Sequence, residues 1–172
     1  MTTFAAQADR PIRVVFLTFY IEAWDALADV HAQMLNDSRF EVTVASIARR
    51  FSKDQPFADE DKVSEFFDEL GVEHIRLDNE DSLKGLDKLR KLKPDYVFIN
   101  YPWQRNYQPG YRVERLSEFT KVCVVPYYSL ALVNEPGEVG AVVVGPLSRI
   151  DFEPETVIVY GNSAQVMRLV NA

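Results

Sequence analysis

The sequence has little of the residue types that form disulfides and structural metal sites. It contains one cysteine, Cys123, and two histidines, His31 and His74. A single cysteine cannot form an internal disulfide, and one thiol with two imidazoles is a poor donor set for a structural zinc ion. We therefore expect neither a disulfide framework nor a bound metal. Cys123 stands among valines, where a thiol is a small buried apolar group, and both histidines are expected to be structural.

Long apolar stretches are also absent. The longest mainly apolar stretches, 14–19 and 122–126, are far shorter than the roughly 20 residues that cross a bilayer. The polar segment from Met1 to Arg10 has no basic region followed by an apolar one, so no secretion signal is predicted. These absences favour a cytoplasmic protein, or one that is peripheral at the inner face of the membrane.

Basic residues are fewer than acidic residues. The chain carries 19 Lys plus Arg against 26 Asp plus Glu, a net charge of −7. Proteins that bind nucleic acid through its phosphates usually carry a basic surplus, so nucleic acid is not an expected partner. Apolar residues make up 47% of the 172 residues, which suits one soluble globular domain.

Short apolar stretches alternate with helical patterns along the first three quarters of the chain. Strands are predicted at Arg13–Tyr20, Glu41–Ile47, Glu73–Leu77, Tyr96–Asn100 and Lys121–Val125. Helices are predicted at Trp24–Leu35, Val63–Leu70, Ser82–Leu92 and Tyr111–Glu118. Because crossovers between parallel strands are right-handed, this alternation predicts an α/β fold: a doubly wound, Rossmann-like parallel sheet in the order 3-2-1-4-5.

Several residues mark the ends and faces of these helices. Gly71 is expected to end the second helix in a left-handed conformation, and Ser82 to cap the third. The leucines of the third helix are predicted to face inward up to Pro94; they are Leu83, Leu86, Leu89 and Leu92.

The composition changes after residue 136. Two strands, at 141–144 and 156–160, and a helix at 163–170 capped by Asn162 are predicted there. We therefore divide the chain into a Rossmann-like domain, 1–136, and a β-β-α tail, 137–172, which either stands apart or joins the same sheet.

The glycine-rich motifs of nucleotide-binding folds are missing. The turn after the first strand lacks Gly-x-Gly-x-x-Gly, and no P-loop or Gly-x-Ser-x-Gly sequence occurs in the chain. No cofactor is therefore predicted, and no general acid and base pair identifies catalytic residues.

Aromatic and amide side chains follow three of the predicted strands. Because ligands bind beyond the carboxyl ends of parallel strands, these residues are candidates for a ligand site. They are Tyr20, Glu22, Trp24, Asn100, Tyr101, Trp103, Tyr127 and Tyr128. Tyrosine and tryptophan offer a flat apolar face and a polar group, as a sugar, polyol or base requires. The alternative is that the aromatic rings only cover the end of the sheet.

Arginines follow the second and fourth strands. Arg49, Arg50 and Arg105 are candidate contacts for a phosphate group, since guanidinium groups bind phosphate well. The alternative is that they are solvated loop residues.

The segments around the fourth and fifth strands resemble a known family. From about Ile12 to Asn134, the sequence is similar to the N-terminal half of bacterial CDP-glycerol glycerophosphotransferase-like proteins. The distinctive parts are Tyr101-Pro102-Trp103, Tyr111-Arg112-Val113 and Val125-Pro126-Tyr127. The resemblance implies the acceptor-side half of a glycosyltransferase-B architecture, which serves synthesis of teichoic-acid-like or capsular polymers of the cell envelope.

Two departures from that family bear on activity. The second domain, which would bind the CDP-activated donor, has no counterpart, and the Trp-His-Gly-Thr motif of many relatives is absent. The resemblance therefore implies a domain that binds a polyol phosphate or sugar without turnover by itself.

Residues 139–172 resemble a different, uncharacterised prokaryotic family of unknown function, and the two resemblances meet near Glu135–Glu138. This leaves two alternatives to the first hypothesis. One is a non-catalytic module that dimerises or binds a missing second domain. The other is a small-molecule-binding domain of unknown function with a site near Tyr160–Asn162.

Overall fold

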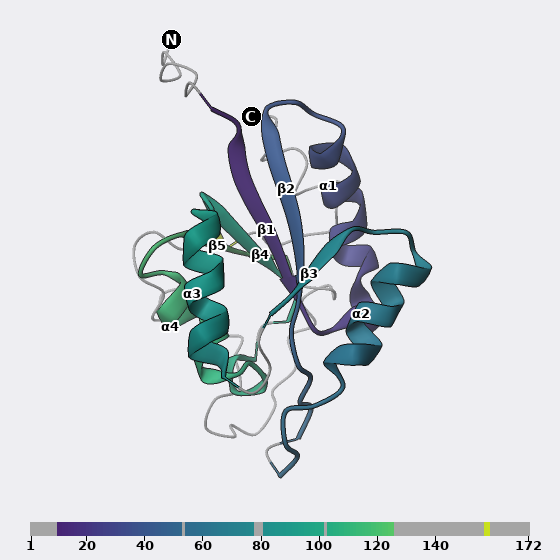
Figure 1. Ribbon diagram of the computed structural model, residues 1–172, viewed down its shortest axis with the longest axis vertical. Helices are drawn as coiled ribbons and strands as arrows, with labels where there is room; N and C mark the ends of the chain where they lie inside the picture. Colours follow the sequence, from purple (N-terminus) through teal and green to yellow (C-terminus); the bar gives the residue numbers. More distant parts are fainter. Residues whose placement is uncertain (1–9, 53, 78–80, 102, 126–156, 159–172) are drawn as a thin grey trace.

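The computed structural model describes residues 10–52, 54–77, 81–101, 103–125 and 157–158. These residues form an α/β fold built on one parallel sheet (Figure 1). Its strands are β1 (Ile12–Thr18), β2 (Phe40–Ser46), β3 (His74–Arg76), β4 (Tyr96–Ile99), β5 (Lys121–Val124) and β6 (Val157–Ile158). The order is β3-β2-β1-β4-β5-β6, and every pair of neighbours is parallel. The predicted order of the first five strands is confirmed.

Helices cover both faces of the sheet (Figure 1). The α-helices are α1 (Asp25–Leu35), α2 (Glu60–Glu69), α3 (Ser82–Leu92) and α4 (Val113–Leu116). Three short 3-10 helices lie in the loops: η1 (Ile21–Ala23), η2 (Gln104–Asn106) and η3 (Pro109–Tyr111). In Figure 1, α1 and α2 lie on one side of the sheet and α3 and α4 on the other. Among the described residues, no helix has the length and apolar character to cross a membrane.

The central strand β1 is buried on both faces, which explains its continuous apolar sequence. Val15 and Leu17 belong to the core between the sheet and helices α3 and α4. Val14 and Phe16 belong to the core between the sheet and helices α1 and α2. Because side chains alternate along a strand, the faces on which these four residues lie also predict the face of each residue that follows them.

The start of α3 differs from the prediction. The cap is Asp81, whose carboxylate accepts hydrogen bonds from the backbone N–H groups of Leu83 and Lys84. The hydroxyl of Ser82 instead accepts a hydrogen bond of 3.0 Å from the N–H of Gly110. Leu83, predicted to face inward, is 57% exposed, because the buried face of α3 runs through Ser82, Gly85, Leu86 and Leu89 and leaves this position beside it.

Other boundary predictions are confirmed or extended. Gly71 has φ +66° just after α2, as expected of a left-handed helix end. The fourth predicted helix, 111–118, is shorter, because Tyr111 ends the 3-10 helix η3 and Arg112 is extended, so that α4 begins at Val113. β6 falls within the predicted strand 156–160, whereas the predictions for 141–144 and 163–170 lie outside the described residues.

Candidate functional site

The carboxyl ends of the strands meet along one edge of the sheet. Thr18 of β1 pairs with Ser46 of β2, and Ser46 pairs with Arg76 of β3. The chain leaves β1 toward α1 on one face and leaves β4 toward η2, on the side of α3. The strand order therefore reverses between β1 and β4, which is where open α/β sheets bind their ligands.

Aromatic rings gather at this reversal. Tyr20 follows β1 and Tyr101 follows β4, and their ring centres lie 4.7 Å apart. Trp103 lies 4.9 Å from Tyr101, and Phe51, from the loop after β2, lies 5.7 Å from Tyr20. We call Phe19, Tyr20, Phe51, Tyr101 and Trp103 the aromatic cluster. The structure thus brings together Tyr20, Tyr101 and Trp103 from the predicted site.

Phe51 and Phe19 also belong to this cluster, although neither was predicted to bind a ligand. Phe19 is fully buried and lies 5.1 Å from Tyr101, so it forms the base of the cluster. Phe51 is 42% exposed and lies at its solvent side. Its position directly after the two arginines that follow β2 is the signal that could have identified it.

Arg49 and Glu22 form an ion pair beside the aromatic cluster. The backbone of Arg49 is fixed by an antiparallel bridge to Ala58, which closes the loop after β2. Its guanidinium carbon lies 4.8 Å from the ring centre of Phe51. The Arg49 side chain is only 11% exposed, whereas that of Glu22 is 49% exposed. A nearly buried cation is therefore held by a carboxylate that water reaches easily.

The other two predicted arginines join the loops to each other. The guanidinium of Arg50 lies 4.0 Å from the ring centre of Phe57 and donates a hydrogen bond to the backbone carbonyl of Arg105. Asn106 returns a hydrogen bond from its side-chain amide to the carbonyl of Arg50. Burial, and then the nearby Arg112, lower the pKa of Arg50 from its usual value. Arg50 thus connects the loop after β2 to the loop after β4.

Asn100 lies under the loop between β1 and α1. It is fully buried, and its amide nitrogen donates hydrogen bonds of 3.0 Å to the backbone carbonyls of Tyr20 and Ala23. This contact holds the segment that carries Tyr20 and Glu22 against the end of β4. The predicted residue Asn100 therefore positions the aromatic cluster from below.

Trp24 lies away from the aromatic cluster, in the apolar core. It is 6% exposed and its ring contacts Phe67 at 4.9 Å, His31 at 5.5 Å and Phe16 at 6.3 Å. It packs α1 against α2 and the sheet, so we do not include it in the site. Tyr127 and Tyr128, also predicted to bind a ligand, lie outside the described residues.

A buried glutamate occupies the same edge on the α1 and α2 face. Glu60, 4% exposed, accepts hydrogen bonds from the hydroxyl of Ser46 and from the guanidinium of Arg76. Arg76 also pairs with Asp61, and these contacts raise the pKa of Arg76. No local pattern predicts this network, because Ser46, Glu60 and Arg76 are widely separated along the chain. All three are partnered, so the network fastens α2 to β2 and β3.

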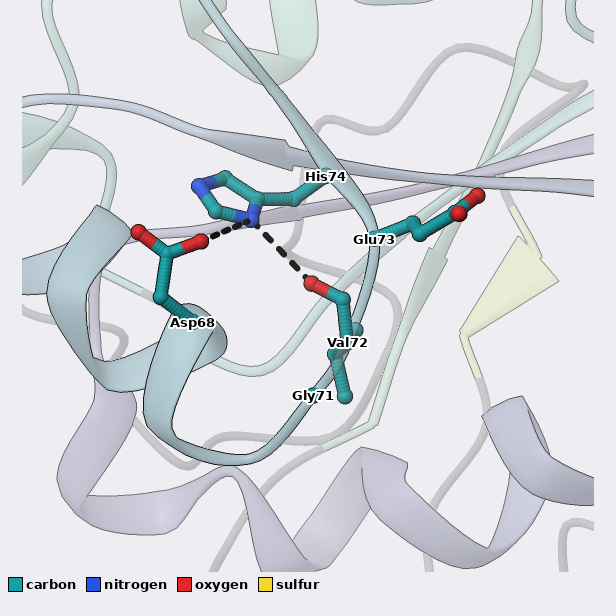
Figure 2. A pocket seen from close by; sticks show the side chains of 5 residues that line it. All are labelled: Asp68, Gly71, Val72, Glu73 and His74. Carbon is teal, nitrogen blue, oxygen red and sulfur yellow. Dashed lines mark hydrogen bonds and ion pairs between the residues drawn. The ribbon is translucent and has the colours of Figure 1, made fainter.

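A depression of about 490 Å³ lies at the opposite edge, where β3 begins (Figure 2). Its lining includes Asp68 and His74, whereas the carboxylate of Glu73 points away from the imidazole. The His74 Nδ1 atom lies 3.1 Å from the carbonyl oxygen of Val72 and 4.0 Å from Asp68 Oδ1. Since a carbonyl only accepts, Nδ1 donates to Val72, and Nε2 lies 2.7 Å from the Ser64 hydroxyl. Ser64 is 6% exposed, which keeps its oxygen from acting on a ligand in the depression.

A smaller depression, about 230 Å³, is formed at the start of β1, β4 and β5. There Arg10 donates two hydrogen bonds of 2.8 Å to Asp95, and this contact lowers the pKa of that carboxyl. The thiol of Cys123 is buried in β5, and burial raises its pKa to about 12. It is thus not a nucleophile at neutral pH. In the described ranges, no group of three or more His, Cys, Asp or Glu residues is arranged to hold a metal ion.

A family model matches the last part of the chain. Residues 121–172 match DUF169, described as uncharacterised ArCR. The match includes the stretch 139–172, and it begins at the first residue of β5, so the paired strands β5 and β6 both lie within it. No curated protein and no solved structure matches the chain.

Proposed function

We propose that this chain binds a small polyol phosphate or sugar phosphate at the carboxyl edge of its sheet. The observation that carries the proposal is the position of Arg49: a nearly buried guanidinium, beside the exposed ring of Phe51 and the half-buried aromatic cluster, at the reversal of strand order. Guanidinium groups bind phosphate through paired, charge-assisted hydrogen bonds. Tyrosine and tryptophan rings pack against the C–H faces of sugars and polyols while their polar groups remain hydrated.

We further propose that the chain is an acceptor-side domain related to CDP-glycerol glycerophosphotransferases of cell-envelope polymer synthesis, working in the cytoplasm. Support comes from the resemblance around Tyr101-Pro102-Trp103, because Tyr101 and Trp103 are in the aromatic cluster. The described edge offers no carboxylate and imidazole pair near Arg49 to act as acid and base. The domain on its own therefore binds without catalysing transfer.

Isothermal titration calorimetry with glycerol 3-phosphate tests the binding proposal. We expect saturable binding by the natural sequence and at least tenfold weaker binding by Arg49→Met, which keeps the length of the side chain but loses its charge. Arg39→Met is the matched control, because Arg39 is also paired with a carboxylate, Asp37, but precedes β2 at the amino edge. This control is expected to bind like the natural sequence.

A second set of ligands tests the acceptor-side assignment. CMP carries the nucleotide part of the donor, so an acceptor-side domain is expected to bind glycerol 3-phosphate and to leave CMP unbound. Binding of CMP alone would contradict the assignment. If neither ligand binds to a chain with an intact circular dichroism spectrum, the binding proposal is contradicted. A mass that rises with protein concentration would then favour a dimerisation or interaction module.

A further inference from the structure

Two buried polar atoms at the strand reversal have no hydrogen-bond partner among the described residues. They are Oγ1 of Thr18, at the end of β1, and Oδ1 of Asn100, directly after β4. Both side chains are fully buried. A buried polar atom without a partner is unfavourable, so such atoms in native proteins usually face a water or ligand.

The two atoms belong to neighbouring positions on one face. β1 and β4 are parallel, with Phe16 opposite Phe98, and continuing this register by two residues puts Thr18 level with Asn100. Phe16 and Phe98 are both in the core below α1 and α2. Since side chains alternate, Thr18 and Asn100 face the same way. Adjacent strands lie about 4.8 Å apart, a spacing that one small polar group can bridge.

The orientation of the Asn100 amide is fixed by its other contacts. Its nitrogen donates to the carbonyls of Tyr20 and Ala23, which can only accept, so the nitrogen and oxygen cannot be exchanged. Oδ1 is therefore an acceptor in need of a donor. The Thr18 hydroxyl both donates and accepts. A hydroxyl group suits the pair, because it can donate to Asn100 and accept from Thr18, whereas a fully ionised phosphate has no donor for Asn100.

We infer that Thr18 and Asn100 select a hydroxylated ligand by holding one ligand hydroxyl between them. This inference rests on the proposed function and narrows it to the polyol part of the ligand. The loop Tyr20–Ala23 links this position to Arg49, because Asn100 holds the carbonyls of the loop and Arg49 pairs with its Glu22. Arg49 would then contribute affinity for the phosphate, and the Thr18–Asn100 pair the preference for a hydroxylated carbon chain.

The test compares glycerol 3-phosphate with n-propyl phosphate, which has the same three-carbon chain without free hydroxyls. We expect the natural sequence to bind glycerol 3-phosphate more tightly by about three- to tenfold, the range for one hydrogen bond. Thr18→Val, which replaces a hydroxyl by a methyl at nearly the same volume, is expected to remove this preference and leave propyl phosphate affinity unchanged. Thr120→Val is the matched control, because Thr120 is also buried with an unpartnered hydroxyl among the described residues but lies at the amino edge, before β5.

The outcomes separate the inference from the proposed function. Equal affinity of Thr18→Val and the natural sequence for glycerol 3-phosphate overturns the inference while the binding proposal stands. Absence of binding to either phosphate by the natural sequence overturns both. An ordered water, in place of a ligand hydroxyl, would make Thr18→Val less stable in urea without changing the preference between the two ligands, and this result also overturns the inference. Circular dichroism of each variant confirms that it is folded.

Discussion

The amide nitrogen of Asn100 donates to the carbonyl oxygens of both Tyr20 and Ala23, each at 3.0 Å. Tyr20 directly precedes the 3-10 helix η1, which carries Glu22, and Ala23 is the last residue of this helix. One buried side chain at the end of β4 thus fixes the loop that follows β1. The position of the aromatic cluster and of the Arg49 partner both depend on this contact.

Asn100→Asp is expected to lower the free energy of unfolding at neutral pH by more than Asn100→Leu. Leucine leaves two buried carbonyls without a donor, a loss of about 1–3 kcal/mol. An ionised aspartate also puts a buried negative charge against the two carbonyl oxygens, which adds to that loss. Urea unfolding followed by circular dichroism measures both. Asn36→Asp is the control, because Asn36 is exposed, and equal stability of Asn100→Asp and the natural sequence would contradict the role given to Asn100.

Gly85→Ala is expected to destabilise the chain, although alanine normally favours a helix over glycine by about 1 kcal/mol. A Cβ at this position of α3 would lie 1.7 Å from the hydroxyl oxygen of Tyr111, whose side chain is fully buried. Crowding of this kind in a packed core costs about 1–3 kcal/mol. The measurement is again urea unfolding, with Lys88→Ala on the exposed face of α3 as the control.

A double variant tests the cause. Tyr111→Phe removes the oxygen that the new methyl would meet, although ring carbons remain at 2.7 Å and 3.1 Å. Gly85→Ala should therefore cost less stability when introduced into the Tyr111→Phe chain than into the natural sequence. The same cost in both backgrounds would show that the clash is not with the tyrosine hydroxyl.

The order of the sheet was predictable from sequence because its central strands are buried on both faces. The continuous apolar stretch around β1 can lie only between two layers of helices, and the alternation with helical periods then fixes a parallel sheet. The helix start at Asp81 was missed because Asp81 and Ser82 are adjacent and both suit a cap. Only the backbone conformation decides between such neighbours.

The site was predictable in part for a similar reason. Carboxyl ends of parallel strands share one edge, so Tyr20 and Tyr101 had to lie near each other. The place of Trp24 depends on Phe67, a contact between two helices that no local pattern reveals. The pairing of Glu22 with Arg49 likewise depends on how the loop after β2 closes through Ala58. Long-range contacts of this kind decide which candidates meet.

The chain is expected to lose stability as the pH falls from about 7.5 to 5.5, in part because of His31. This side chain is 8% exposed and packs on Phe16 and Trp24, and burial lowers its pKa from 6.5. The unfolded chain therefore binds the proton more readily. The stability contributed by neutral His31 is fully present above the pKa that His31 has in the unfolded chain, and it is lost as the pH falls below that pKa.

The comparison with His31→Leu isolates this contribution. The free energy of unfolding of both proteins is measured in urea at several pH values. As the pH falls through 6.5, the natural sequence should lose stability relative to His31→Leu. Hydrogen bonds from Arg39 and Arg10 are the largest cause of the lowered pKa values of Asp37 and Asp95. The stability that these two carboxylates contribute is lost only below about pH 4, outside the pH range of this measurement. A difference that stays constant from pH 7.5 to 5.5 would contradict the prediction.

Variants of Glu22 and Arg49 are expected to change phosphate binding in opposite directions. In the absence of ligand, Glu22 occupies the guanidinium of Arg49, so its carboxylate competes with an incoming phosphate. Glu22→Gln keeps the shape but removes the competing charge, and we expect it to bind glycerol 3-phosphate about three- to tenfold more tightly, whereas Arg49→Met binds it more weakly. Calorimetry measures both, and Glu41→Gln, which removes a carboxylate paired with Arg13 near the amino edge, is the control. Weaker binding by Glu22→Gln would instead mean that the Glu22 carboxylate accepts hydrogen bonds from the hydroxyl groups of the ligand. The ion pair with Arg49 would then position this carboxylate for the ligand.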